Sequence, residues 1–334
     1  MDKTNSRIAI LGTGAWGTAL ATVLLNAGNS VAMWGIDDQE INDLKSQKNT
    51  KFFGDKKFDG ELFLVTKDIN QIADFKPQFV IIAVPSVHIE NVLSKVVNII
   101  KSKPIYVNVA KGFDPKSLKI WSPTINRIIK NKSKGLVALI GPSFAIEVYD
   151  KNRTIVNVVC EKINIAKRVK KIFDTDYFKC VAINDMNGAE TISALKNVMA
   201  IATGILYSQH TSINTRSAIL AQIAKEISYI LKIMGGKQET LYQFCGIGDI
   251  YLTCTSEKSR NFSLGLAIGR LGSGQIKDMI KTKTVEGYWA TKIAYEIIKK
   301  YKIHAPIIIH LYKILYKNSD SKDFINYIMK AIKE

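Results

Sequence analysis

Two charged residues stand alone in long apolar stretches of the second half of the sequence. Lys196 is the only charged side chain in residues 191–209, and Asp249 is the only one in residues 240–256. A buried ammonium group is costly unless an anion pairs with it, so we expect the two opposite charges to satisfy each other. A lysine buried and paired in this way can transfer protons, with the neighbouring Asn197 as a neutral hydrogen-bond partner. The alternatives are an ordinary buried salt bridge and a lysine whose chain extends along its helix to solvent.

A glycine-rich motif near the N-terminus points to a different chemistry. Gly12, Gly14 and Gly17 form a G-x-G-x-x-G pattern directly after the apolar residues 8–11 and before a helical pattern. In such a strand–turn–helix unit the first glycine permits the tight turn, the second lets the backbone approach a pyrophosphate, and the third lets helix and strand pack closely. The N–H groups and the dipole at the helix start would hold the anionic pyrophosphate. The motif therefore predicts a dinucleotide site.

The same motif usually has an acidic residue about 20 positions further on, which binds the adenosine ribose. Asp37 lies at that distance from Gly17. Asp37 and Asp38 would serve equally well as caps of the helix that follows them. Both interpretations of Asp37 stay open at this point.

Further polar residues follow two of the predicted strands. Lys111 comes after the apolar residues 105–110 and before Gly112, so it lies at the carboxyl end of a strand, where open α/β sheets bind ligands. Gly141 follows another strand and begins a short G-P-S-F-A segment. Within it, Ser143 is a candidate for a helix cap or for a contact with a ligand.

Ser259, Arg260 and Asn261 place one of the few arginines between two hydrogen-bonding side chains, which suits a phosphate group. The alternative is the start of a helix at the surface. No metal-binding set is expected, because the histidines are dispersed at 88, 210, 304 and 310. A Ser-His-Asp mechanism would also need a nucleophile elbow, which the sequence lacks, so hydride transfer fits these residues best.

The elements that must position these residues are predicted from hydrophobic spacing. Short β-rich runs alternate with helical patterns up to about Asp185, which is typical of a sheet covered by helices. Strands are expected at 8–11, 30–34, 63–65, 79–84, 105–110, 136–140, 154–159 and 178–183. Most of them are continuously apolar, which favours buried parallel strands. Helices are expected at 15–27, 37–47, 86–100, 119–130 and 163–173.

The rest of the chain shows helical patterns alone. Glycines divide it at 235–236, 246–248 and 272–274. The second glycine motif, Gly269 to Gly274, lies between helical patterns and predicts only a turn. The last helix, residues 324–332, is amphipathic and is expected to pack onto its own domain. We therefore divide the chain into a dinucleotide-binding domain, residues 1–186, and a helical substrate and catalytic domain, residues 187–334.

Composition narrows the class of protein. The 334 residues, 47% of them hydrophobic, suffice for two domains with cores and exclude a disordered or fibrous chain. The net charge of +18 comes from scattered lysines with few arginines. This distribution favours a bias in surface composition over nucleic-acid binding, and it is compatible with a small phosphorylated substrate.

The cysteines and the N-terminus bear on the cellular compartment. No metal-type spacing occurs among the cysteines, which predicts free thiols in a reducing compartment. Residues 8–27 are apolar enough to resemble a signal peptide, but Asp2 and the glycines from Gly12 to Gly17 argue against one. No apolar run reaches the ~18 residues of a membrane span. We expect a cytoplasmic homodimer with no nucleic-acid partner and no stable membrane insertion.

Taken together, the motifs resemble those of the bacterial NAD(P)-dependent sn-glycerol-3-phosphate dehydrogenase family. The resemblance extends from the first predicted strand to beyond residue 287. The matching segments, in order, are Gly12–Gly17, Ala110–Gly112, Gly141–Ala145, Ala194–Ala202, Asn214–Ala218, Gly246–Asp249, Ser259–Asn261 and Val285–Gly287. The resemblance implies an α/β fold, with an N-terminal Rossmann-type doubly wound sheet followed by an all-helical C-terminal domain.

The motifs and the resemblance together give the candidate site residues. The catalytic candidates are Lys196, the implied proton donor or acceptor at the C2 oxygen of the substrate, with Asp249 near it and Lys111. The cofactor-binding candidates are Gly12, Gly14, Ala15, Trp16, Gly17, Asp37, Lys111, Gly141, Ala145, Arg260 and Glu286. The substrate-binding candidates are Lys111, Gly141, Ser143, Lys196, Asn197, Asp249, Ser259, Arg260 and Asn261.

One departure from the family pattern concerns the cofactor. Many relatives have Arg or His just before the aspartate that ends the second strand, whereas this chain has Ile36 before Asp37. A 2′-phosphate would lack that cation and would be repelled by Asp37. The expected cofactor is NAD(H) or NADP(H), with a slight preference for NAD(H), and no metal.

The activity that the resemblance implies is the reversible reduction of dihydroxyacetone phosphate to sn-glycerol 3-phosphate, which supplies glycerol 3-phosphate for phospholipid synthesis. Two alternatives remain. The chain would otherwise be a two-domain dehydrogenase acting on a 3-hydroxy acid or a sugar acid, or a non-catalytic nucleotide sensor or basic interaction module. The lone Lys196 and Asp249 speak against the second alternative.

Overall fold

The computed structural model describes residues 5–209, 211–272 and 285–332, which form two compact units. The sheet unit comprises Met1–Ala110 and Trp121–Met186, and the helical unit comprises Lys111–Ile120 and Asn187–Glu334. The segment Lys111–Ile120, expected in the first domain, thus clusters with the second. Phe113 and Ile120 are the reason, because both are buried in the core of the helical unit.

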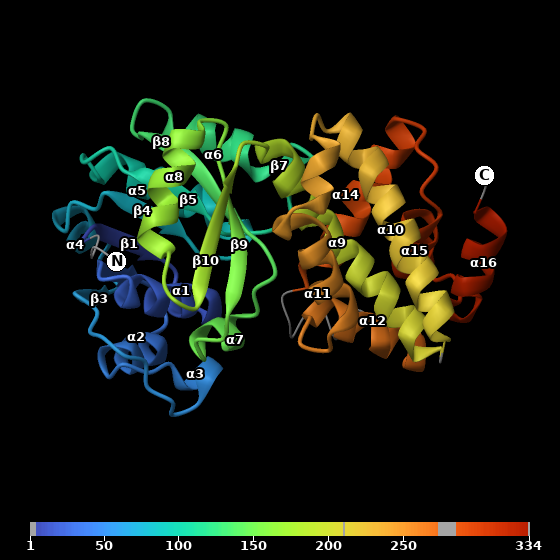
Figure 1. Cartoon of the computed structure of the whole chain (residues 1–334), viewed down its shortest axis with the longest axis horizontal. Helices are drawn as coiled ribbons and strands as arrows, with labels where there is room; N and C mark the ends of the chain where they lie inside the picture. Colours follow the sequence, from blue (N-terminus) through green and yellow to red (C-terminus); the bar gives the residue numbers. More distant parts are fainter. Residues whose placement is uncertain (1–4, 210, 273–284, 333–334) are drawn as a thin grey trace. The chain divides into compact units, whose positions relative to one another are not determined.

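The sheet unit is built on eight strands (Figure 1). They are β1 (Arg7–Leu11), β2 (Ser30–Trp34), β3 (Leu64–Thr66), β4 (Phe79–Ile82), β5 (Ile105–Asn108), β8 (Gly135–Ile140), β9 (Thr154–Val159) and β10 (Phe178–Ile183). Their order is β10-β9-β8-β5-β4-β1-β2-β3. The last six members of this order reproduce the 3-2-1-4-5-6 arrangement of dinucleotide-binding sheets, so the Rossmann-type prediction is confirmed.

One step in the sheet is antiparallel. β9 pairs antiparallel with β8, while β10 runs parallel to β9. The continuous apolar composition of these strands favours parallel pairing throughout, so this pair differs from the prediction. That composition reflects burial on both faces, which is the same for either strand direction.

Helices cover both faces of this sheet. They are α1 (Ala15–Asn26), α2 (Asp38–Lys45), α3 (Thr50–Phe53), α4 (Ile69–Asp74), α5 (Ile89–Ile99), α6 (Trp121–Ile129), α7 (Ala145–Tyr149) and α8 (Ile163–Phe173). Residues of α1, α7 and α8 join one buried core, and residues of α5 and α6 join another. The expected helices are present, α7 lies where a helix start was expected after Gly141, and the short α3 and α4 were not predicted.

The helical unit is arranged around one deeply buried helix. Its elements are β6 (Phe113–Asp114), β7 (Lys119–Ile120), α9 (Met186–Ser208), α10 (Ile213–Ile233), α11 (Asp249–Thr255), α12 (Arg260–Leu271), α14 (Glu286–Lys300), α15 (Pro306–Lys317) and α16 (Phe324–Ala331). Helix α9 is buried on every side from Ala189 to Leu206, as expected of a central core helix. Glycines permit its contact with α12, because a Cβ at Gly265 would collide with the carbonyl of Ile201.

The glycine motif at 269–274 differs from its prediction. Gly269 is not in a turn but inside α12, where a Cβ would collide with the Ser208 hydroxyl. Gly272 ends the helix with φ +81°, a conformation that favours glycine, and residues 273–274 lie outside the described part.

Among the described residues, no helix is long and apolar enough to cross a membrane. All four cysteines are free thiols and buried.

Candidate active site

The two isolated charges of the helical unit form an ion pair. The ammonium of Lys196, in the middle of α9, pairs with Oδ1 of Asp249, the first residue of α11. The two side chains are 2% and 1% exposed. The pairing expected from the sequence is therefore confirmed, and the alternative of a lysine that extends to solvent is wrong. A catalytic role for the pair stays a prediction.

The position of Asp249 depends on the glycine turn that precedes α11. Gly246 has φ −93° and ψ −115°, outside the helical region. A Cβ there would collide with the carbonyl oxygens of Thr240 and Leu241. Glycine lets the chain fold tightly at this point, and the turn then delivers the carboxylate of Asp249 to the buried face of α9.

Burial and neighbouring charges set the acidity of Lys196. Burial lowers the pKa of the Lys196 ammonium to about 8, Asp249 opposes this effect, and Lys111 adds to it. The ammonium is thus predominantly protonated at neutral pH but gives up its proton more readily than an ordinary lysine. A group with these properties suits proton donation to a developing oxyanion.

Lys111 lies near this pair within the same unit. It follows β5 and precedes the β6–β7 hairpin, whose Phe113 and Ile120 are anchored in the helical core. Its positive charge acts directly on the ammonium of Lys196. The structure therefore brings together the three residues predicted for catalysis, Lys196, Asp249 and Lys111.

Three of the motifs found in the sequence meet beside α9. The backbone N–H of Gly287 donates to Oδ1 of Asn261 at 3.0 Å. A Cβ at Gly287 would lie 2.7 Å from that oxygen and would also collide with the carbonyl of Asn197. Asn197 and Asn261 are buried. Their segments can approach Gly287 this closely because glycine has no side chain. Glu286, the next residue, begins α14.

The predicted phosphate-binding triplet forms the start of α12. Ser259 caps this helix, because its hydroxyl accepts a hydrogen bond from the backbone N–H of Phe262 at 3.3 Å. Ser259 and Asn261 are buried, whereas Arg260 is exposed. The helix-start interpretation is thus confirmed for Ser259. It leaves the exposed guanidinium of Arg260 in a position to meet an anion.

In the sheet unit, the glycine-rich turn has the shape that a pyrophosphate requires. Gly12 has φ +121°, and a Cβ there would lie 2.7 Å from the carbonyl oxygen of Ala83. A Cβ at Gly17 would collide with the carbonyl of Gly12. Beside Gly14, in contrast, a Cβ would meet nothing within 4 Å, so the backbone at the start of α1 is open to a ligand. The turn, with Ala15 and Trp16 in the first turn of α1, fits a dinucleotide.

Asp37 caps α2, as one of the two interpretations of this residue predicts. Its Oδ1 accepts a hydrogen bond from the backbone N–H of Glu40 at the start of α2, at 3.0 Å. Its Oδ2 pairs with the ammonium of Lys51 at 2.9 Å. The hydrogen bond from Lys51, and then that from Glu40, lower the pKa of the Asp37 carboxyl, so the group is ionised. A ribose-binding role stays a prediction alongside this cap.

The segment after β8 partly contradicts its prediction. Helix α7 does begin at Ala145, but its N-cap residue is Phe144, and no side chain caps it. The hydroxyl of Ser143 instead donates to the carbonyl of Gly141 at 2.9 Å, so the capping role expected for Ser143 is wrong. Gly141 is required by packing, because a Cβ there would lie 2.8 Å from the Cα of Val156.

Two sets of polar residues near the predicted sites were not predicted from the sequence. Thr253 is buried one turn after Asp249, and its hydroxyl donates to the Asp249 carbonyl at 2.7 Å. A polar residue four positions from Asp249 in an apolar segment was the available signal. The second group, Glu40 and Lys51, contacts Asp37, and no spacing rule connects Lys51 with that residue.

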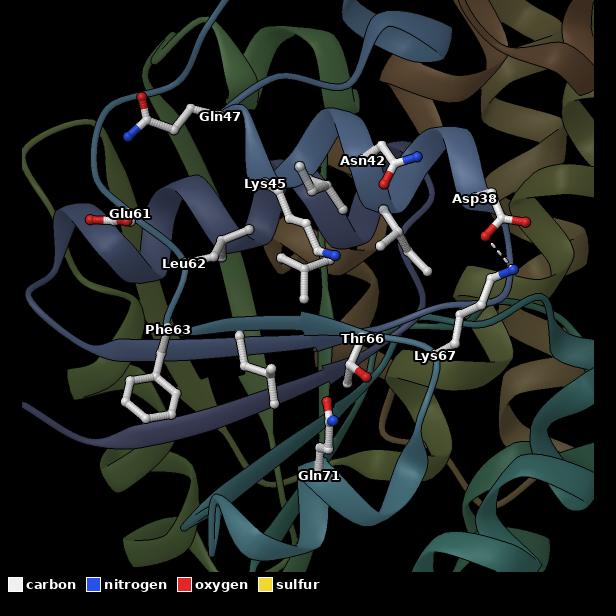
Figure 2. Close-up of a pocket in the computed structure, with 14 residues that line it drawn as sticks. Asp38, Asn42, Lys45, Gln47, Glu61, Leu62, Phe63, Thr66, Lys67 and Gln71 are labelled. Carbon is white, nitrogen blue, oxygen red and sulfur yellow. Dashed lines mark ion pairs between the residues drawn. The ribbon is translucent and has the colours of Figure 1, made fainter.

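One cavity of about 590 Å³ lies between α2 and the edge strand β3 (Figure 2). It is lined by polar side chains such as Asn42, Gln47 and Gln71, and the ion pair of Asp38 and Lys67 borders it. No predicted site residue lines this cavity. Within the described ranges, no group of three or more His, Cys, Asp or Glu side chains is arranged to hold a metal ion.

Comparison with known proteins bears on both units. Residues 7–166 match the model of the NAD-dependent glycerol-3-phosphate dehydrogenase N-terminus, and residues 185–326 match that of the C-terminus. The chain is 42% identical over 326 residues to a glycerol-3-phosphate dehydrogenase (NAD(P)+) of Malacoplasma penetrans, covering 96% of this chain and 95% of that protein. It is 37% identical over 328 residues to the same-named protein of Mycoplasma mobile, covering 97% and 96%.

Solved structures give the same result for the fold. The crystal structure of glycerol-3-phosphate dehydrogenase from Coxiella burnetii matches with a TM-score of 0.87 and 26% sequence identity, covering 98% of this chain and 99% of that one. The similarity therefore extends over both units and includes the segments that carry the ion pair and the glycine-rich turn.

Proposed function

Because the chain belongs to the NAD-dependent glycerol-3-phosphate dehydrogenase family, we propose that it interconverts dihydroxyacetone phosphate and sn-glycerol 3-phosphate, mainly in the direction of reduction. The observation that carries this proposal is the buried ion pair of Lys196 and Asp249 with Lys111 beside it. A salt bridge with no chemical task would not require a third cation nearby, since that cation destabilises the charged lysine.

The proposed reaction assigns a separate task to each group. A bound nicotinamide nucleotide supplies the hydride that reaches C2 of the substrate. Lys196 donates a hydrogen bond to the C2 carbonyl oxygen and transfers its proton as negative charge develops there. Asp249 fixes the direction of the Lys196 ammonium and keeps it protonated before the reaction. In the oxidation direction the same amine, now neutral, takes the proton of the C2 hydroxyl.

Binding of the phosphate end is proposed for a second set of residues. Arg260 is exposed at the first position of α12, and Asn261 and Ser259 are fixed beside it. An arginine presents several donors to a phosphate in a fixed geometry, and Lys111 would add a second cation. Holding the substrate in a reactive pose is worth roughly 7 kcal/mol or more in favourable cases.

The sheet unit is proposed to bind the nucleotide. Its glycine-rich turn leaves the backbone open at Gly14, and α1 begins directly after it. We thus assign cofactor binding to residues 1–186, and we assign action on the substrate to residues 187–334 together with Lys111. We further propose that the protein is a cytoplasmic homodimer that supplies glycerol 3-phosphate for phospholipid synthesis.

The test is a substrate panel with the purified chain. Nicotinamide absorbance is followed with NADH and with NADPH, each with dihydroxyacetone phosphate or with a 3-oxo acid of similar size. We expect consumption of reduced nucleotide with the phosphorylated ketone alone. Turnover of the oxo acid instead would identify a hydroxy-acid dehydrogenase, and nucleotide binding without turnover of either substrate would identify a sensor.

A further inference from the structure

The last three helices of the helical unit lie side by side and share an outer surface. Helix α15 packs between α14 and α16 (Figure 1). Nε2 of His304, in the connection between α14 and α15, donates to the carbonyl oxygen of Ala331 at the end of α16, at 2.8 Å. This hydrogen bond brings the connection beside the end of α16. We call the exposed side chains of residues 289–332 the C-terminal face.

The C-terminal face is basic. Residues 289–332 contain eight lysines against three acidic residues, and residues 297–319 and 324–332 contain no acidic residue at all. The lysines of these two acid-free segments are all exposed, and they are Lys299, Lys300, Lys302, Lys313, Lys317 and Lys330. Acids of the same segments therefore do not neutralise their charges.

Large apolar side chains are exposed among these lysines. Trp289 in α14 is 61% exposed, and Tyr301 in the connection is 48% exposed. Met329 and Ile332, at the end of α16, are 63% and 45% exposed. Because the hydrogen bond of His304 joins these two segments, apolar and basic side chains are mixed at this end of the face.

The inner sides of the three helices account for their packing. The core of the helical unit contains residues from all three, such as Ile297, Leu311 and Phe324. Trp289 and Met329 do not belong to that core. Folding of the unit therefore does not require these two outer side chains to be apolar, and their exposure leaves them available to a partner.

The composition of the face matches an anionic lipid surface better than a second copy or a nucleic acid. Two copies would bring like charges together at the contact. Nucleic-acid sites usually contain arginines that hold phosphates, and residues 289–332 include no arginine. Anionic lipid headgroups attract lysines, and tryptophan and tyrosine are favoured at the level of the headgroups.

We propose that the C-terminal face binds reversibly to the surface of anionic lipid bilayers. The lysines contact the headgroups, and the exposed apolar side chains enter the interface between headgroups and water. The helices lie on the bilayer and do not cross it. This inference goes beyond the proposed function, because binding of the face to lipid requires neither nucleotide nor substrate.

The test is sedimentation of the full chain with unilamellar vesicles. One set of vesicles is phosphatidylcholine with about one-quarter phosphatidylglycerol, and the other is phosphatidylcholine alone. We expect the protein to bind the anionic vesicles at least about tenfold more tightly than the neutral ones. Raising the salt concentration from about 50 to about 300 mM should weaken this binding by about tenfold or more.

A triple variant tests the lysines of the face. Each lysine near an anionic surface strengthens binding about fivefold, so Lys299→Gln, Lys300→Gln and Lys302→Gln together should weaken binding to anionic vesicles about 100-fold. All three side chains are exposed, so the variant should keep the native melting temperature and the native rate of NADH oxidation.

The matched control removes three lysines from the sheet unit. Lys162, Lys167 and Lys171 are exposed in and beside α8, and their joint replacement by glutamine changes the net charge by the same amount. This control should bind anionic vesicles within about twofold of the native protein. The comparison separates the C-terminal face from the overall positive charge of the chain.

Tryptophan emission tests the apolar part of the face. Trp289 is exposed, whereas the other three tryptophans, at 16, 34 and 121, are partly or fully buried. The emission of the native protein should move to shorter wavelength on addition of anionic vesicles, because Trp289 enters a less polar environment. Trp289→Phe should lose most of this change.

Several results would overturn the inference. They are equal binding to both kinds of vesicle, equal binding by the triple variant and the α8 control, and no binding of the native protein to vesicles. In the last case, light scattering and titration with labelled duplex DNA would identify the alternative partner. A lower mass of the triple variant would indicate an interface between copies, and loss of DNA binding in that variant would indicate a nucleic-acid site. Turnover of dihydroxyacetone phosphate is measured separately, so the proposed function can fail without the inference and the inference without it.

Discussion

Replacing Asp249 by asparagine tests the Lys196 chemistry most informatively. The substitution keeps the shape of the side chain but removes the charge that pairs with the Lys196 ammonium, while Lys111 remains nearby. Keeping an unpaired ammonium in this site would cost about 3–5 kcal/mol. The lysine can relieve that cost by losing its proton, so its pKa should fall.

The size of the effect follows from the pKa of Lys196. An adjacent opposite charge shifts a pKa by about 1–3 units. From its value of about 8, the pKa of Lys196 should therefore fall to roughly 6 in Asp249→Asn. At about pH 7.5 the protonated fraction then drops from roughly three-quarters to about 3%, a loss of about 25-fold, whereas near pH 5.5 the loss is less than about twofold.

The assay is the pH profile of kcat/KM for reduction of dihydroxyacetone phosphate. In the native protein activity should decline above about pH 8, and in Asp249→Asn the decline should begin about two pH units lower. Asp55→Asn is the control, because this acid-to-amide change affects an ion pair at a carboxylate that is 92% exposed. An alkaline limb at the same pH in Asp249→Asn and the native protein would refute the argument that Asp249 keeps Lys196 protonated.

Three further predictions concern stability and binding. Burial raises the pKa of Glu226 from 4.5 to about 7, so the folded state holds this proton more tightly than the unfolded chain, and the resulting stability is lost as the pH rises from about 4.5 to 7. In urea unfolding the stability of the native protein should fall relative to that of Glu226→Gln by up to roughly 3 kcal/mol between about pH 4.5 and pH 8. Parallel pH dependences of the two proteins would contradict this. Gly14→Ala should keep the native melting temperature but bind NADH at least about tenfold more weakly. Gly17→Ala should instead lose about 1–3 kcal/mol of stability. The opposite pattern in thermal melts and NADH titrations would disprove the roles assigned to the turn. Arg260→Ala should raise the KM for dihydroxyacetone phosphate about tenfold or more with a smaller change in kcat, and an unchanged KM would remove Arg260 from phosphate binding.

Much of the fold was predictable because burial leaves a direct trace in the sequence. All eight strands of the main sheet coincide with apolar runs, and β2, β9 and β10 have the expected bounds. The short helices α3 and α4 were missed because four and six residues are too few to show a helical period. The antiparallel direction of β9 left no trace either, since it depends on the connection between strands and not on which side chains are buried.

Among the candidate site residues too, buried ones were predictable from the sequence and surface contacts were not. Lys196 and Asp249 were found because an isolated charge in an apolar segment needs a partner, and only one opposite charge of that kind existed. The contact of Lys51 with Asp37 was not predictable. Both groups are accessible at the surface, and their contact depends on where the segment between α2 and α3 places Lys51. The association of Lys111 with the helical unit was also not predicted. It depends on the burial of Phe113 and Ile120 in the core of the helical unit, whose other residues lie much later in the sequence.

The most direct test of the central claim compares the native protein with Lys196→Met for both catalysis and nucleotide binding. Methionine fills similar space but has no proton to donate. We predict that the variant binds NADH like the native protein, while its rate of NADH oxidation with saturating dihydroxyacetone phosphate falls by about 100-fold or more. A native rate in the variant, with NADH binding intact, would contradict it.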